Sequence, residues 1–213
     1  MCLKNKGRVL WPETPLTDRG GGTYEDAAMD LRVLINRGES YRHAADVVVG
    51  AGFSAVPAIP NVTKGLEGIG YGACKYPDLC YAVAFLYRQW LEILLKCAIL
   101  LGRRLGDQES SFPGIHDVRR LWRKVEPVLK QWCPAVTQQQ LVTTSDHIRQ
   151  LSQLAKGSTE FRYPRNKGGW DVVLPSRQDL QGLCVPIGEF LASCIAEMYE
   201  QRKSRRLATN TGG

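Results

Sequence analysis

Three charged residues interrupt the apolar middle of the segment between residues 78 and 105, whose ends are also charged. Arg88, Glu92 and Lys96 are spaced four apart, so a helix would place them on one face. Charges on a core helix cost free energy unless they are paired. Two interpretations stay open: an internal ion pair that orients its neighbours, or one wall of a polar pocket.

A second candidate group lies in "GIHDVRRLW", where the next helix is expected to begin. His116 sits at that start, and Asp117 falls in the first turn, where the helix dipole favours an acid. The imidazole of a histidine can act as a general acid or base near neutral pH. The alternative role for the pair is capping and orientation of the helix.

The third group is the segment "STEFRYPRNKGGW", residues 158–170, which joins two predicted helices. The guanidinium groups of Arg162 and Arg165 suit phosphate or carboxylate. Tyr163 and its aromatic neighbours suit stacking on bases. Alternatively, the aromatic rings close the end of the bundle while the arginines pair with Glu92 or Asp117.

Composition narrows the function classes. The net charge of +7 favours a polyanionic partner, with nucleic acid first. Seven cysteines without a C-x-x-C pair indicate free thiols in a reducing compartment, and the three histidines lack ligand spacing. No P-loop, Rossmann, G-x-S-x-G or H-E-x-x-H pattern occurs. We therefore expect a cytoplasmic protein with no metal, no cofactor and no membrane span.

The elements that position these groups are predicted to be helices. Apolar residues recur at three- and four-residue steps over 24–50, 78–105, 116–132, 137–156 and 176–203. Asp78 is the expected N-cap of the second of these helices, and Pro186 is expected to bend the last. The pattern predicts an all-α fold, an antiparallel bundle of four or five helices in one domain over 24–203. A short loop or hairpin insertion, with "WDVVLP" as a strand, precedes the last helix.

Other segments are expected to lie outside the packed bundle. Residues 1–23 are predicted to form a flexible arm, and 204–213 a disordered tail. Residues 52–77 are rich in proline and glycine and are expected to form a long loop.

The order of the three polar groups resembles the HEPN superfamily of higher-eukaryote and prokaryote nucleotide-binding domains. The resemblance covers about residues 40–203 and rests on these matches: Glu92 and Lys96 in E-x-x-x-K, His116-Asp117-Val118, and Arg162-Tyr163-Pro164. It implies an all-α bundle, frequent homodimers, and roles in RNA cleavage or binding. It also implies bacterial toxin–antitoxin, abortive-infection or phage-defence systems, often beside a nucleotidyltransferase.

Ribonucleases of that superfamily carry R-x(4–6)-H, usually on a late helix. In this chain the motif is missing or displaced, since its one formal match is Arg37 to His43 on the first helix. We therefore expect a non-catalytic HEPN-like protein that binds RNA, a nucleotide or a partner protein such as a nucleotidyltransferase antitoxin. The alternatives are a metal-independent ribonuclease that uses Arg37 with His43, or His116 with Arg162, and a structural or assembly subunit.

Overall fold

The fold is all-α, as the sequence predicts. A computed structural model describes residues 31–50, 77–108, 111–154 and 176–210. Within these ranges the secondary structure is helical, with no strand. The helices are α2 (Leu31–Gly50), α3 (Pro77–Leu105), α4 (Val118–Trp132), α5 (Gln138–Leu154) and α6 (Arg177–Asn210).

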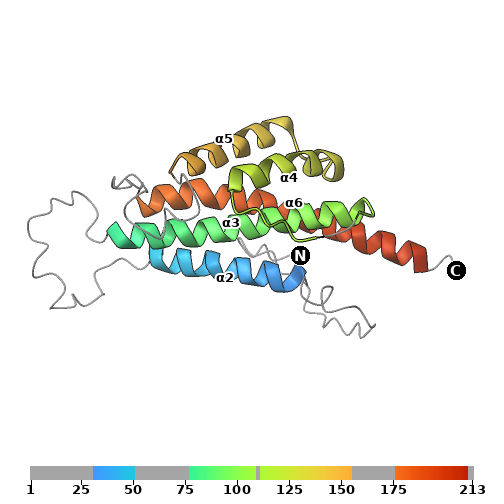
Figure 1. The fold of residues 1–213 in the computed structure, drawn as a ribbon, viewed down its shortest axis with the longest axis horizontal. Coiled ribbons are helices and arrows are strands. Elements are labelled where there is room, and N and C mark those ends of the chain that lie inside the picture. The colour runs from blue at the N-terminus through green and yellow to red at the C-terminus, as the bar shows by residue number, and fades with distance from the viewer. Residues whose placement is uncertain (1–30, 51–76, 109–110, 155–175, 211–213) are drawn as a thin grey trace, which may run out of the picture.

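The central helix of the bundle is α3. It packs between α2 on one side and α4 on the other, and α6 lies alongside it (Figure 1). The direction of the chain reverses between α2 and α3, whereas α6 runs the same way as α3 (Figure 1). The α4–α5 pair covers α3 and α6 on the side away from α2.

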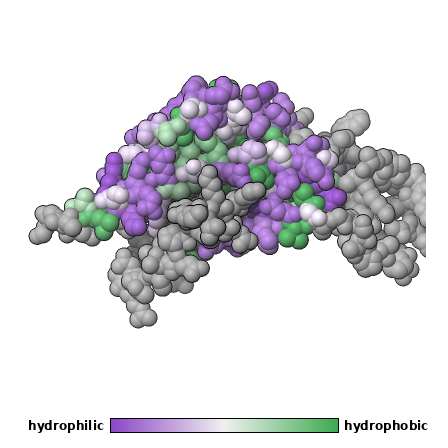
Figure 2. Space-filling model, turned by 180° about the vertical axis from the view of Figure 1, so that it is seen from behind, coloured by the Kyte–Doolittle hydropathy of each residue, from purple (hydrophilic) through white to green (hydrophobic). Residues whose placement is uncertain are grey.

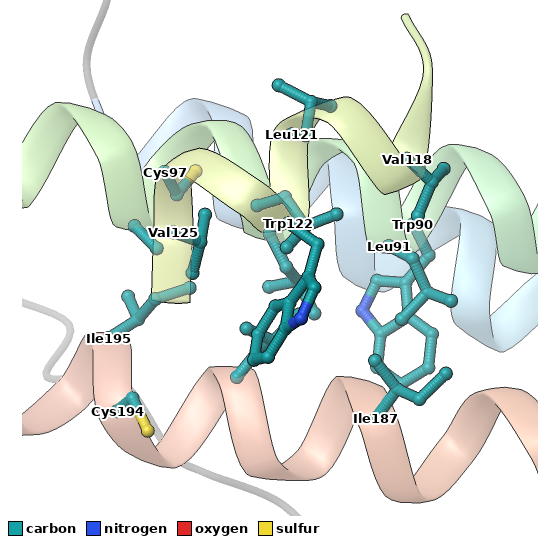
Figure 3. Close-up of a cluster of buried hydrophobic side chains, with 14 of the residues drawn as sticks. Trp90, Leu91, Cys97, Val118, Leu121, Trp122, Val125, Ile187, Cys194 and Ile195 are labelled. Atoms are coloured by element: carbon teal, nitrogen blue, oxygen red, sulfur yellow. The ribbon is translucent and has the colours of Figure 1, made fainter. Parts of the chain in front are cut away.

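The core forms around α3 because apolar residues cover most of its surface. The side chains of these α3 residues are 1% exposed or less: Trp90, Leu91, Leu94 and Leu95. Figure 3 shows Trp90 and Leu91 beside Ile187 of α6, while Trp122 and Val125 of α4 fill the next layer of the same cluster. The helix therefore buries both its apolar side chains and the three charges among them.

Close helix contacts depend on glycine at two places. A Cβ added at Gly188 of α6 would lie 2.0 Å from the Trp90 ring, and one at Gly102 of α3 would lie 2.3 Å from Val128 of α4. Gly38 of α2 faces the same indole from the other side, where an added Cβ would lie 3.4 Å from it. The absence of side chains at these positions lets α2, α4 and α6 approach α3.

Three helices begin at side-chain caps. Asp117 accepts a hydrogen bond from the Arg120 N–H at 2.8 Å and caps α4. A reciprocal capping box starts α5, where Thr137 pairs with Gln140. The start of α6 repeats this arrangement with Ser176 and its partner three residues on. These local bonds fix where each helix enters the bundle.

Some predicted boundaries differ from the structure. α3 begins at Pro77, so Asp78 lies inside the helix and is not its N-cap; proline suits the first helical position because it lacks an N–H. α4 begins two residues after His116 because Asp117 caps it. α6 continues to Asn210, seven residues past the predicted end, so residues 204–210 of the expected tail are helical. Arg205 there donates to the Leu105 carbonyl, which ties the extension to α3.

Other predictions fall outside the described residues. These are the arm over 1–23, the start of the first helix before Leu31, the loop up to residue 76, and the insertion with "WDVVLP". Among the described helices, α6 is long and apolar enough over Arg177–Arg205 to cross a bilayer, a test that core helices also meet. Its residues Ile187 and Ile195 are buried in the core cluster.

Candidate functional site

The three charges of α3 form a buried ion cluster. Arg88, Glu92 and Lys96 stack along one face, and each is 5% exposed or less. Lys96 Nζ lies 2.9 Å from Glu92 Oε1, and Arg88 Nη1 lies 3.5 Å from Glu92 Oε2. The carboxylate therefore bridges the two cations, which agrees with the internal ion pair among the two interpretations of the sequence.

His116 completes this cluster from outside α3. Its Nδ1 lies 2.9 Å from Glu92 Oε1, the oxygen that also pairs with Lys96. The Arg88 guanidinium donates to the backbone carbonyl of His116. Glu92 of α3 thus holds the ring of His116, and Arg88 holds its backbone. The structure brings together four of the candidate residues from two separate sequence segments.

The imidazole of His116 is the exposed member of the cluster. Its side chain is 66% exposed, whereas that of Glu92 is 6% exposed. A carboxylate acceptor at Nδ1 favours the tautomer that carries the proton there, which leaves Nε2 able to accept one. The arrangement is an exposed histidine that a buried carboxylate orients through Nδ1.

In the part of the chain that the structure describes, the cluster joins two cations to one carboxylate. Two buried cations, Arg88 and Lys96, share the single carboxylate of Glu92. The ammonium group of Lys96 also lies 4.7 Å from the centre of the Phe112 ring, whose face attracts cations. Burial strengthens these interactions because the local dielectric is low. Within the described residues, cations thus outnumber carboxylates in the cluster that His116 joins.

Asp117 does not join the cluster. Its side chain is exposed and accepts the N–H bond that caps α4. The capping interpretation of Asp117 is therefore the one that the structure supports. The same bond fixes the start of α4 next to His116, which places the basic face of that helix beside the imidazole.

This basic face consists of four exposed cations in two successive turns of α4: Arg119, Arg120, Arg123 and Lys124. None of the four forms an ion pair with another residue in the described ranges. Lys130, further along α4, is paired with Glu126 at 2.7 Å. The opposite face of α4 is apolar and buried, so the helix holds its cations towards solvent. On the side seen in Figure 2, hydrophilic residues also cover most of the described surface.

Arg37 and His43 lie elsewhere. Both are exposed on α2, and six helical positions separate them by about 240° around the axis, so they face different directions. α2 and α4 lie on opposite sides of α3 (Figure 1), so the helix that carries His43 is separated from α4. Arg162, Tyr163 and Arg165 lie outside the described residues.

A second polar network, which the sequence analysis missed, centres on Asp46 of α2. Its carboxylate accepts hydrogen bonds from the Tyr87 hydroxyl and, at 3.2 Å, from Gln181 Nε2. Arg42 links the same carboxylate, at 3.5 Å, to Glu189 of α6, at 3.1 Å. Burial raises the pKa of Tyr87 well above its usual value, and the bond to Asp46 raises it further. The network joins α2, α3 and α6.

The four-residue spacing of Arg42 and Asp46 was the one local signal in the sequence for the network around Asp46.

In the described ranges, no three histidine, cysteine or acidic side chains are grouped so that they could hold a metal ion. No family model, no curated protein and no solved structure matches the chain.

Proposed function

We propose that this chain is a HEPN-like helical protein that binds RNA or a nucleotide through the basic face of α4. The observation that carries the proposal is the row of four exposed cations without ion pairs in the described ranges. Arginine side chains suit phosphate because their donors match two oxygens at once. The bacterial defence, toxin–antitoxin or stress setting is what the resemblance implies.

Packing on the buried side of α4 fixes the position of the helix that carries the basic face. Trp122 is buried on the opposite side of the helix, and its Nε1 donates to Ser145 of α5 at 2.8 Å. At the other helix contact, Gly102 lets Val128 pack closely against α3. Because the helix is fixed on two sides, the cations need little ordering of the backbone when they bind a phosphate chain.

The test is binding of a single-stranded RNA, measured by fluorescence anisotropy at several salt concentrations. The variant Arg119→Ala with Arg123→Ala should bind more weakly than the wild type. Losing two phosphate contacts should also reduce the slope of log affinity against log salt by about 1.4, at about 0.7 per contact. Far-UV circular dichroism establishes that the variant remains folded.

A matched control separates this face from the general charge of the protein. Lys130→Ala with Arg149→Ala removes the same number of cations, but both side chains are paired on the surface, with Glu126 and Asp146. The control should keep most of the affinity. If both double variants lost the same RNA affinity, binding would depend on net charge alone, and the proposal that the basic face of α4 binds RNA would be wrong.

A second candidate function, a metal-independent ribonuclease, is favoured by the Glu92–His116 contact. Nε2 of His116 would remove the proton of a 2′-hydroxyl, and the resulting oxygen would attack the adjacent phosphorus. The bond to the 5′-oxygen would break, that oxygen would take a proton, and a 2′,3′-cyclic phosphate would form. The four cations of the basic face would hold the neighbouring phosphates.

This activity is tested separately from binding, by incubating RNA with the protein in the presence of a chelator. His116→Ala should abolish cleavage and retain RNA binding, while the α5 control His147→Ala retains both. Loss of cleavage in His43→Ala instead would favour the Arg37–His43 pair. RNA that stays intact with the wild type would exclude the ribonuclease and leave the binding proposal standing.

A further inference from the structure

Two buried cysteines meet where α4 ends against α6. Cys133 is the C-cap of α4 and is 1% exposed, and Cys194 of α6 is 3% exposed. The Cys133 Sγ lies 3.7 Å from the backbone oxygen of Cys194. The side chain of Cys133 therefore lies against the residue that carries the second thiol, and each thiol shifts the pKa of the other.

Hydrogen bonds around Cys133 fix the end of α4 against α6. The Cys133 N–H donates to Leu129 O at 2.8 Å, and its carbonyl accepts from Val136 N at 3.0 Å. Next to it, the Trp132 carbonyl accepts a hydrogen bond of 2.9 Å from Gln201 of α6. Figure 3 shows Cys194 and Ile195 of α6 in the same cluster as Val125 of α4. The end of α4 therefore lies against α6 at both Cys194 and Gln201.

We propose that Cys133 and Cys194 form a reversible disulfide when the protein meets a peroxide, which crosslinks the end of α4 to α6. The crosslink would join two residues that are 61 positions apart in the sequence, and it would attach the helix with the basic face covalently to the bundle. This inference is independent of RNA binding and of the ribonuclease candidate.

The electronic environment of the pair differs from that of the other buried thiols. The side chain of Cys194 lowers the pKa of the Cys133 thiol, and the side chain of Cys133 raises the pKa of the Cys194 thiol. Burial raises the pKa of Cys97 and of Cys184 to about 12. Because the thiolate is the nucleophile, Cys133 is the thiol expected to react first.

The reaction balances with hydrogen peroxide as the oxidant. The Cys133 thiolate attacks one peroxide oxygen, the O–O bond breaks, and the released hydroxide takes up the proton of the thiol as water. The Cys194 sulfur then displaces hydroxide from the sulfenic acid on Cys133, and this hydroxide takes the Cys194 proton. Two thiols lose two electrons, the peroxide gains them, and two waters form. The exposed residues Pro134 and Ala135 beside Cys133 mark where the oxidant enters on local opening.

The experiment exposes the purified full chain to hydrogen peroxide, blocks the remaining thiols by alkylation in denaturant, and maps the peptides by mass spectrometry. Cleavage after Glu189 separates Cys184 from Cys194, so the partner of Cys133 is identified without ambiguity. The expected product is a peptide pair joined through Cys133 and Cys194 that dithiothreitol separates. The melting temperature should rise by about 10 °C on oxidation, given the size of the closed loop.

Variants make the outcome specific. Cys194→Ala should abolish the oxidant-induced rise in melting temperature, whereas Cys97→Ala should retain it. The proposal is overturned if both thiols remain open to alkylation after equilibration with peroxide and with oxidised glutathione. It is equally overturned if Cys133 bridges to a cysteine other than Cys194.

Discussion

The buried ion cluster predicts a large stability loss when its single carboxylate is neutralised. In Glu92→Gln the shape of the side chain is nearly unchanged, but Arg88 and Lys96 lose the negative charge between them. The side chains of these two cations are 5% and 4% exposed, so water cannot take over the role of the carboxylate. The change tests whether the cluster is held together by charge or by packing.

The size of the effect follows from burial. Breaking a buried ion pair from one side typically costs about 3–5 kcal/mol because a charge remains buried without its partner. The glutamine oxygen still accepts a hydrogen bond, so we expect about 3 kcal/mol, at the lower end of that range. For a chain of this length, such a loss lowers the melting temperature by roughly 6–12 °C.

The same substitution at Glu126 is the control. Glu126 and Lys130 form a similar i,i+4 pair, but their side chains are 32% and 50% exposed. Exposed pairs of this kind contribute about 0–1 kcal/mol. Urea unfolding followed by far-UV circular dichroism gives the free energy of unfolding for both variants. Glu92→Gln should therefore lose about 2–3 kcal/mol more than Glu126→Gln.

A third variant tests whether the loss of stability in Glu92→Gln comes from the buried charge of Lys96. Adding Lys96→Met to Glu92→Gln removes a buried cation that residue 92 no longer neutralises, and it should recover part of the lost free energy because apolar replacement of a buried ion is well tolerated. The reasoning fails if the Glu92 and Glu126 variants lose the same free energy. It also fails if the double variant is less stable than Glu92→Gln alone.

Two further predictions concern packing and ionisation in the core. Gly188→Ala would place a methyl group 2.0 Å from the Trp90 ring and should cost about 1–3 kcal/mol in urea unfolding, whereas Gly182→Ala in the same helix meets nothing within 4 Å and should gain about 0.5–1 kcal/mol. Equal effects would contradict the close contact. Burial also raises the pKa of Cys97 and Cys184 from 9.0 to about 12, so these thiols ionise in the unfolded chain first, and stability should fall as pH rises from 9 to 12. Cys184→Ala should reduce the slope of the free energy of unfolding against pH by up to about 1.4 kcal/mol per pH unit. An unchanged slope would contradict the raised pKa of Cys184.

The sequence predicted the parts of the fold that depend on local spacing. The buried residues of α4, from Val118 to Leu129, follow the helical periodicity that predicted this helix. The four-residue spacing of Arg88, Glu92 and Lys96 placed them on one face for the same reason. Periodicity is a property of a single helix, so it survives whatever that helix packs against.

Contacts between distant segments were harder to predict. Asp46 meets Tyr87 and Gln181, which are 41 and 135 residues away, and no local pattern marks such partners. Cys133 and Cys194 are likewise 61 residues apart, and their apolar surroundings suggested only separate buried thiols. The contact between Glu92 and His116 was not predicted either, although each residue had been singled out as a polar candidate.

The placement of Trp90 between Gly188 of α6 and Gly38 of α2 has a consequence for how the chain can diverge. An indole of this size leaves no room for a side chain at Gly188 and little at Gly38. A relative with a smaller residue at position 90 would have space to fill at both glycines. We therefore expect these three positions to change as a set among descendants of a common ancestor, with the total volume shared by three helices held nearly constant.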